Sequence, residues 1–183
     1  MLGNSESDPM NTEEQPFDWL IAPISSEQFF AEYWEQKPVH IQRGNPEYYK
    51  DIITQADLDN LISNGDLRYP ALRLVQKGTD TPRETPFYPA EAYTANWKHG
   101  TNVYAGMPDV DKIFAEYRAG ASINLPGLEQ FWRPLLDLCV AVEGCLNHAV
   151  RTNGYITSAN SQAFALHYDS HDVFVMQIAG KKR

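Results

Sequence analysis

The strongest constraint on the fold is a change in hydrophobic period near residue 148. Before this point apolar residues recur mainly at helical spacing, interrupted by three short segments with the pattern of strands, at 39–43, 71–76 and 121–125. After it the period is two, and we expect strands at 148–157, 164–167 and 173–178. Helices and short strands followed by consecutive strands predict an α+β fold, with a β-rich core from about residue 148 onward.

Local signals place the helices. Ser25 with Gln28 forms a capping box ahead of an aromatic segment that should be helical until Lys37-Pro38. A helix is predicted to begin at Thr54, and another to be capped by Asp109 and to end at Gly120. The longest helix is predicted over 128–147, where Pro134 marks either a kink or the true first turn.

Composition narrows the classes of function. The chain has 15 basic and 24 acidic residues, a formal net charge of -9, which argues against nonspecific nucleic-acid or membrane binding and favours a basic partner. No apolar run reaches the roughly 18 residues of a membrane span. The polar, acidic start (1–16) is expected to be a disordered tail before a folded part at 17–183. Cys139 and Cys145 are predicted to be core residues in a reducing compartment, so we expect a cytoplasmic protein.

A cluster of metal-ligand side chains lies directly before the last predicted strand. In His167-Tyr168-Asp169 the outer side chains share one face of an extended segment, as in two thirds of a 2-His-1-carboxylate Fe(II) site. A hydrogen-bonded His/Asp pair that caps a strand has the same sequence, and His171 has the parity to replace His167. A helical zinc-protease motif is rejected because residue 168 is Tyr rather than Glu.

The surroundings of this motif resemble a known family. The segment NGYITSANSQAFALHYDSHDVFVMQIAGKKR (153–183) contains an Asn-x-Tyr strand, a Ser/Gln-rich loop, His-x-Asp, a Val-Phe-Val-Met-Gln run and Gly-Lys-Lys. This pattern is similar to the core of JmjC-type cupins related to ribosomal oxygenases, which are Fe(II)- and 2-oxoglutarate-dependent protein hydroxylases. FFAEYWEQKPVHIQR (29–43) resembles the same family's first segment, whereas 51–109 matches only loosely. The resemblance implies a double-stranded β-helix that is incomplete in this chain.

The resemblance also implies roles for individual residues. His167 and Asp169 correspond to the first two iron ligands, and Lys182 to the cation that pairs with the distal carboxylate of 2-oxoglutarate. Alternation from Ile178 through Gly180 should point Lys182 inward. Asn153 and Tyr155 correspond to positions that line the cosubstrate or substrate pocket, although a structural role explains them equally well.

The family's third ligand, a distal His, follows the His-x-Asp motif on a later strand. His40, His99 and His148 all precede the motif, so we expect this chain to be an N-terminal fragment of a longer enzyme, inactive alone. The implied full-length protein is a homodimer that acts on an Arg or His of a basic ribosomal protein. Two alternatives stay open: a cupin-like binding domain without catalysis, and an inactive truncated product. Because His167, Asp169 and Lys182 are all present, the oxygenase is the leading hypothesis.

Overall fold

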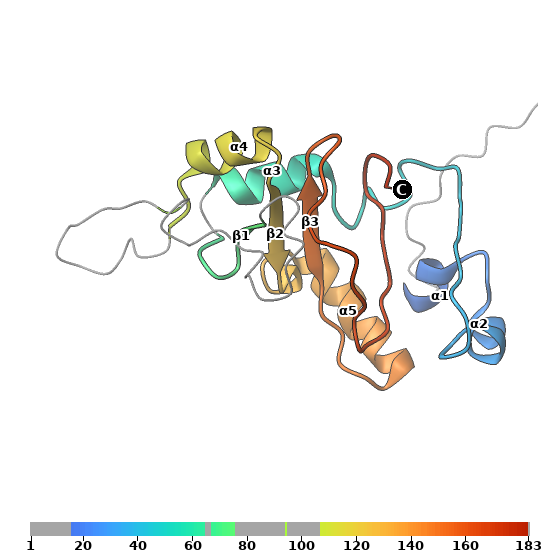
Figure 1. Cartoon of the computed structure of the whole chain (residues 1–183). Coiled ribbons are helices and arrows are strands. Elements are labelled where there is room, and N and C mark those ends of the chain that lie inside the picture. Colours follow the sequence, from blue (N-terminus) through green and yellow to red (C-terminus); the bar gives the residue numbers. More distant parts are fainter. Residues whose placement is uncertain (1–15, 65–66, 76–93, 95–106, 183) are drawn as a thin grey trace, which may run out of the picture. The chain divides into compact units, whose positions relative to one another are not determined.

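The computed structural model describes residues 16–64, 67–75, 94 and 107–182 (Figure 1). They form two compact units, which are described separately below. Unit 1 comprises the described residues of Met1–Gln55, Arg133–Val150 and His171–Arg183, and unit 2 those of Ala56–Trp132 and Arg151–Ser170. The predicted tail, apart from Pro16, lies outside the described residues.

Unit 1 is helical. It contains α1 (Pro16–Ile21), α2 (Ser26–Glu32) and α5 (Arg133–Leu146), and α1 packs against both of the others. Ser25 caps α2 as predicted, because its hydroxyl accepts the Gln28 amide at 3.2 Å. The predicted helix at 128–147 is instead divided into a short 3₁₀ helix, η3 (Leu128–Gln130), which lies in unit 2, and α5.

An aromatic cluster in unit 1 joins the first two helices to the segment around Phe174. The Phe17 ring lies edge-on to Phe29 at 5.5 Å and stacks on Phe30 at 5.7 Å between ring centroids. Phe174 contacts the same rings, at 6.4 Å from Phe17 and 6.0 Å from Phe29. The predicted aromatic stripe of the second helix therefore docks on α1 and on the segment that follows His-x-Asp.

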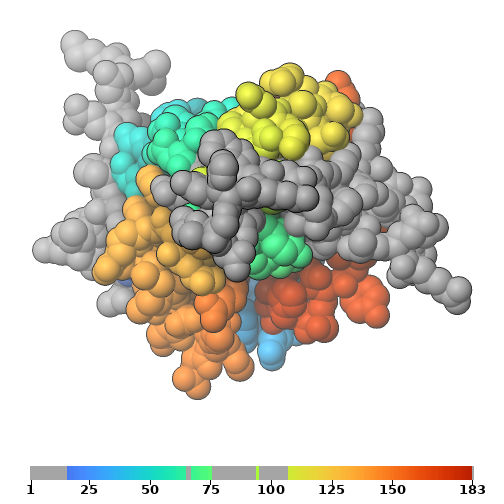
Figure 2. Space-filling view, turned by 90° about the vertical axis from the view of Figure 1, so that its left-hand side faces the viewer, coloured from blue at the N-terminus to red at the C-terminus, as the bar shows by residue number. Residues whose placement is uncertain are grey.

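Unit 2 is built on a small antiparallel sheet. β2 (Ser122–Pro126) lies between β1 (Arg73–Val75) and β3 (Asn153–Thr157), as Figure 1 shows. Two helices, α3 (Gln55–Ser63) and α4 (Val110–Arg118), lie side by side in both Figure 1 and Figure 2. Asp109 caps α4 as predicted by accepting the Lys112 amide at 3.2 Å.

The register of the sheet separates an apolar face from a polar one. Residues opposite each other in antiparallel strands share a face, and successive residues alternate between faces. Ile123 pairs with Leu74 and Ile156, and these residues form the apolar face. The polar face carries the pairs Ser122–Thr157, Asn124–Tyr155 and Pro126–Asn153, with Arg73 opposite Asn124.

Several strand predictions are wrong. Among the described residues, no strand forms at 39–43, 164–167 or 173–178. The described part of the chain contains helices and a three-stranded antiparallel sheet, in agreement with the α+β class. Alternation reports which side chains could share a face, but a strand also needs a partner backbone to bond with. Cys139 is buried, whereas Cys145 is exposed, which corrects its predicted place in the core. No helix in the described part of the chain is long and apolar enough to cross a membrane.

Candidate functional site

Two predicted pocket residues, Asn153 and Tyr155, lie on the polar face of the sheet. They are two positions apart in β3 and therefore point to the same side. Tyr155 is 45% exposed, and its cross-strand partner is Asn124, which is only 4% exposed. The strand thus presents a half-exposed phenol above a buried amide.

The Tyr155 phenol is held from several sides. Its ring meets Phe164 edge-on at 5.8 Å between centroids, and its hydroxyl is hydrogen-bonded with the Asn124 side chain. Partial burial raises the pKa of Tyr155 above its usual value, the negative charge of Asp169 raises it further, and the bond with Asn124 opposes both. Tyr155 is therefore a neutral hydrogen-bond donor at neutral pH.

His167 is exposed, and its ring orientation is fixed by two contacts. Its Nδ1 lies 2.8 Å from the Ala165 carbonyl oxygen, and its ring meets Phe164 edge-on at 5.6 Å. A carbonyl only accepts hydrogen bonds, so Nδ1 carries the proton and the lone pair is on Nε2. This is the tautomer that a metal-binding imidazole adopts when its other nitrogen bonds to a backbone carbonyl.

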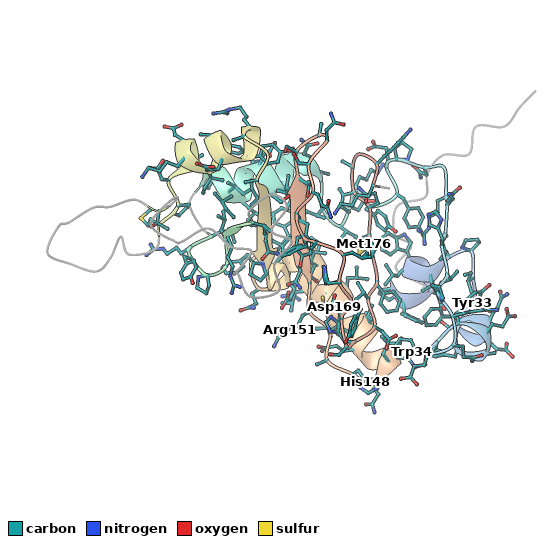
Figure 3. All side chains as sticks on the ribbon, viewed as in Figure 1. Tyr33, Trp34, His148, Arg151, Asp169 and Met176 are labelled. Carbon is teal, nitrogen blue, oxygen red and sulfur yellow. The ribbon has the colours of Figure 1, made fainter. Side chains whose placement is uncertain are left out.

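These contacts define a cluster in unit 2, here called the β3 cluster: Asn124, Tyr155, Phe164, His167 and Asp169. Phe164 links the Tyr155 ring to the His167 ring, and Asp169 acts electrostatically on Tyr155. Asp169 is exposed, and Figure 3 labels it in the segment that follows β3. No three His, Cys, Asp or Glu residues in the described ranges converge as a complete metal site. His167 and Asp169 are thus two exposed donors that are each linked to Tyr155, His167 through the Phe164 ring and Asp169 through its charge.

Comparison with known proteins finds a family match for this region. Residues 128–183, which include every member of the cluster except Asn124, match the JmjC domain. The whole chain is 29% identical over 182 residues to the bifunctional lysine-specific demethylase and histidyl-hydroxylase NO66 of Aedes aegypti, covering 100% of the chain and 26% of that protein.

Vertebrate proteins show a similar relationship to this chain. Ribosomal oxygenase 1 of Danio rerio is 30% identical over 168 residues, and the human protein of that name is 28% identical over 166. Each match covers 91% of the chain, but 28% and 23% of the respective relatives. The chain is thus a distant homologue of the ribosomal oxygenases and spans about a quarter of their length.

The remaining predicted residues of the JmjC segment lie in unit 1. Lys182 and His171 are both exposed there, and the neighbouring segment is anchored through Phe174. Gly180 adopts a left-handed backbone with φ +74°, so period-two alternation does not continue from Ile178 to Lys182. Strand alternation therefore no longer supports the predicted inward direction of Lys182, and the role proposed for this residue rests on the resemblance alone.

Two residues near β3 were not found from the sequence. Asn124 stood in a predicted strand without a role, because the register that pairs it with Tyr155 cannot be read from sequence. Glu129 stood in the predicted long helix, yet it is 3% exposed and accepts hydrogen bonds from Arg151 Nη1 and the Thr152 amide, both at 3.0 Å. Pro134 was the available signal that the helix begins after Glu129.

Proposed function

We propose that a protein containing this chain is an Fe(II)- and 2-oxoglutarate-dependent oxygenase that hydroxylates a protein side chain. One observation carries the proposal: His167 and Asp169 form a His-x-Asp pair within a JmjC match, beside a neutral phenol. The homology to ribosomal oxygenases supports the reaction class.

The donors present suit the metal. An imidazole nitrogen and a carboxylate oxygen are ligands that Fe(II) takes in oxygenases. His167 offers Nε2 because Nδ1 is bonded to Ala165, and both His167 and Asp169 are exposed. These two residues would hold the ion. When bound, Fe(II) together with 2-oxoglutarate supplies the activation of dioxygen that hydroxylation requires.

The other residues of this chain would bind and orient the anionic cosubstrate. The neutral Tyr155 hydroxyl can donate to a carboxylate, and the Asn153 amide lies on the same face of the sheet. Lys182 would supply the positive charge that offsets the desolvation of the distal carboxylate. Phe164 holds the Tyr155 and His167 rings in place, because it contacts both edge-on.

The proposed substrate is an Arg or His of a ribosomal protein. The names of the relatives point to ribosomal oxygenation and to histidyl hydroxylation by those proteins. A net charge of -9 favours a basic partner through electrostatic attraction. We further propose that the longer protein is a homodimer and acts in the cytoplasm.

Substitution of the two ligands tests the proposal. In a longer protein containing this chain, His167→Ala and Asp169→Ala should abolish the conversion of 2-oxoglutarate to succinate, followed by NMR. His171→Ala is the matched control, because it removes a neighbouring exposed imidazole, and it should retain turnover. Turnover that survives His167→Ala but is lost in His171→Ala would transfer the role to His171. Turnover that survives all three changes would refute the metal site.

Lys182 separates an oxygenase from a cupin-like domain that binds only metal. Lys182→Ala should raise the apparent 2-oxoglutarate constant about tenfold or more, the equivalent of one charge-assisted hydrogen bond. Lys181→Ala removes the adjacent exposed cation and should have little effect. If Lys181→Ala weakens cosubstrate binding and Lys182→Ala does not, the assignment is wrong by one residue. If neither does, the 2-oxoglutarate role of this segment is refuted.

A further inference from the structure

The central strand β2 contains two buried polar side chains on one face. Ser122 is fully buried and Asn124 is 4% exposed. Burying an amide or hydroxyl is costly unless it is hydrogen-bonded, so each must have a partner. Ser122 donates to the Thr157 hydroxyl at 3.0 Å, and the Asn124 side chain bonds with the Tyr155 phenol. Of these two pairs, only Asn124–Tyr155 belongs to the β3 cluster.

We infer that Asn124 is a positioning residue, which holds the Tyr155 hydroxyl so that its proton points to a carboxylate ligand on the polar face of the sheet. This inference rests on the proposed function for the identity of the ligand, 2-oxoglutarate. The backbone register fixes the approach, because Asn124 and Tyr155 are directly opposite each other in adjacent strands. The ring is held edge-on by Phe164, which leaves the hydroxyl as the adjustable part of the side chain.

The direction of the hydrogen bond follows from its effect on the phenol. The bond with Asn124 lowers the pKa of Tyr155, which means that it stabilises the phenolate, so the amide N–H donates to the phenol oxygen. The hydroxyl proton is then left to donate elsewhere, and donation to an anion is the stronger bond. Burial and the charge of Asp169 keep the phenol protonated.

The charges around the phenol are compatible with this role. Asp169 repels a phenolate and, when neutralised by a bound cation, would oppose a ligand carboxylate less. Arg73 is opposite Asn124 on the same face of the sheet, and its Nε donates to the Pro70 carbonyl oxygen at 3.0 Å. The polar face thus carries a cation on β1, an amide on β2 and a neutral donor on β3.

The test compares two buried β2 substitutions. In the chain labelled with ¹³Cζ-tyrosine, the Tyr155 signal is assigned by its loss in Tyr155→Phe and followed against pH. Asn124→Leu should move the ionisation of Tyr155 to higher pH, because the stabilising N–H is removed. Ser122→Ala removes the neighbouring hydroxyl of the same face and should leave the ionisation unchanged. Should Asn124→Leu not fold, Asn124→Ala also removes the donor without adding a charge and should shift the ionisation in the same direction.

The same labelled chain then reports on the ligand. Titration with 2-oxoglutarate should shift the Tyr155 signal, with about tenfold weaker binding in Asn124→Leu than in Ser122→Ala. An unchanged Tyr155 ionisation in the Asn124 variants would overturn the positioning role. So would equal weakening of binding by both variants, since that indicates a loss of packing. If 2-oxoglutarate leaves the wild-type signal unchanged while Asn124→Leu still moves the ionisation, the cosubstrate proposal fails and the Asn124–Tyr155 coupling stands.

Discussion

Replacing Glu129 with alanine is expected to destabilise unit 2 through the beginning of β3. The Glu129 carboxylate accepts the Thr152 amide at 3.0 Å, and the Leu128 amide donates to the Thr152 carbonyl at 2.9 Å. η3 therefore holds both backbone groups of Thr152, immediately before Asn153 and Tyr155. Alanine at 129 leaves the Thr152 amide without its acceptor.

The magnitude follows from the environment of the two partners. Glu129 is 3% exposed, whereas the Arg151 side chain is 73% exposed. A hydrogen bond to a charged group contributes about 1.5–3 kcal/mol, and an exposed ion pair about 0.2–1 kcal/mol. Glu129→Ala should therefore lower the free energy of unfolding by about 2–4 kcal/mol. Arg151→Ala should cost about 1 kcal/mol or less, because water can replace the guanidinium.

Urea denaturation monitored by circular dichroism would measure these free energies. Glu129→Gln serves as the intermediate variant, because its amide oxygen can still accept the Thr152 N–H, and it should fall between the other two. Hydrogen exchange adds a local readout, since the β3 amides should exchange faster in Glu129→Ala. A loss below about 0.5 kcal/mol in Glu129→Ala, or an equal loss in Arg151→Ala, would refute the reasoning.

Two further predictions concern the same strand. Gly154→Ala should lower the free energy of unfolding by about 1–2 kcal/mol, because its Cβ would lie 3.2 Å from Leu128 Cδ2 and 3.3 Å from Leu125 Cβ. Gly144→Ala in α5 is the control: its Cβ would meet nothing within 4 Å, so it should raise the free energy of unfolding by about 0.5–1 kcal/mol. Thermal denaturation that gives both changes the same sign would contradict this. Because the pKa of Tyr155 is raised in the folded chain, protonated Tyr155 makes a contribution to the free energy of unfolding that depends on pH. This contribution is fully present below a pH of about 10, the ordinary pKa of tyrosine, and is lost as the pH rises through the folded pKa. The stability difference between wild type and Tyr155→Phe should therefore decline above that pH in urea titrations, and a constant difference would exclude the effect.

Helix boundaries could be predicted where a side chain bonds to the backbone within its own turn. Ser25 and Asp109 cap α2 and α4 as expected, because each accepts an amide three residues later. Such contacts depend only on neighbouring residues, and the sequence contains all of them. Glu129 shows the limit of this approach, since its partner Thr152 is distant in the chain and its burial depends on tertiary structure.

Strand pairing could not be predicted, for a related reason. Segment 173–178 has the composition and alternation of a strand, yet it forms none, because alternation does not supply a partner backbone to bond with. The two-sided burial of β2 also explains why Asn124 was missed. A polar residue at an alternate strand position usually indicates a solvent-facing side chain. Here both faces of β2 are covered, so the same residue becomes a buried hydrogen-bonding partner.

Glu129 and Asn124 act on Tyr155 by different routes, and their variants should therefore separate stability from chemistry. Glu129 fixes the backbone of Thr152, so Glu129→Ala should lower the stability of the fold and increase the mobility of the residues at the start of β3. Asn124 bonds to the phenol itself, so its loss should change the ionisation of Tyr155 even in a folded chain. In Glu129→Ala, the Tyr155 ionisation should recover its wild-type position when conditions restore the fold. In Asn124→Leu no stabilising condition should restore it, because the missing group is the hydrogen-bond donor.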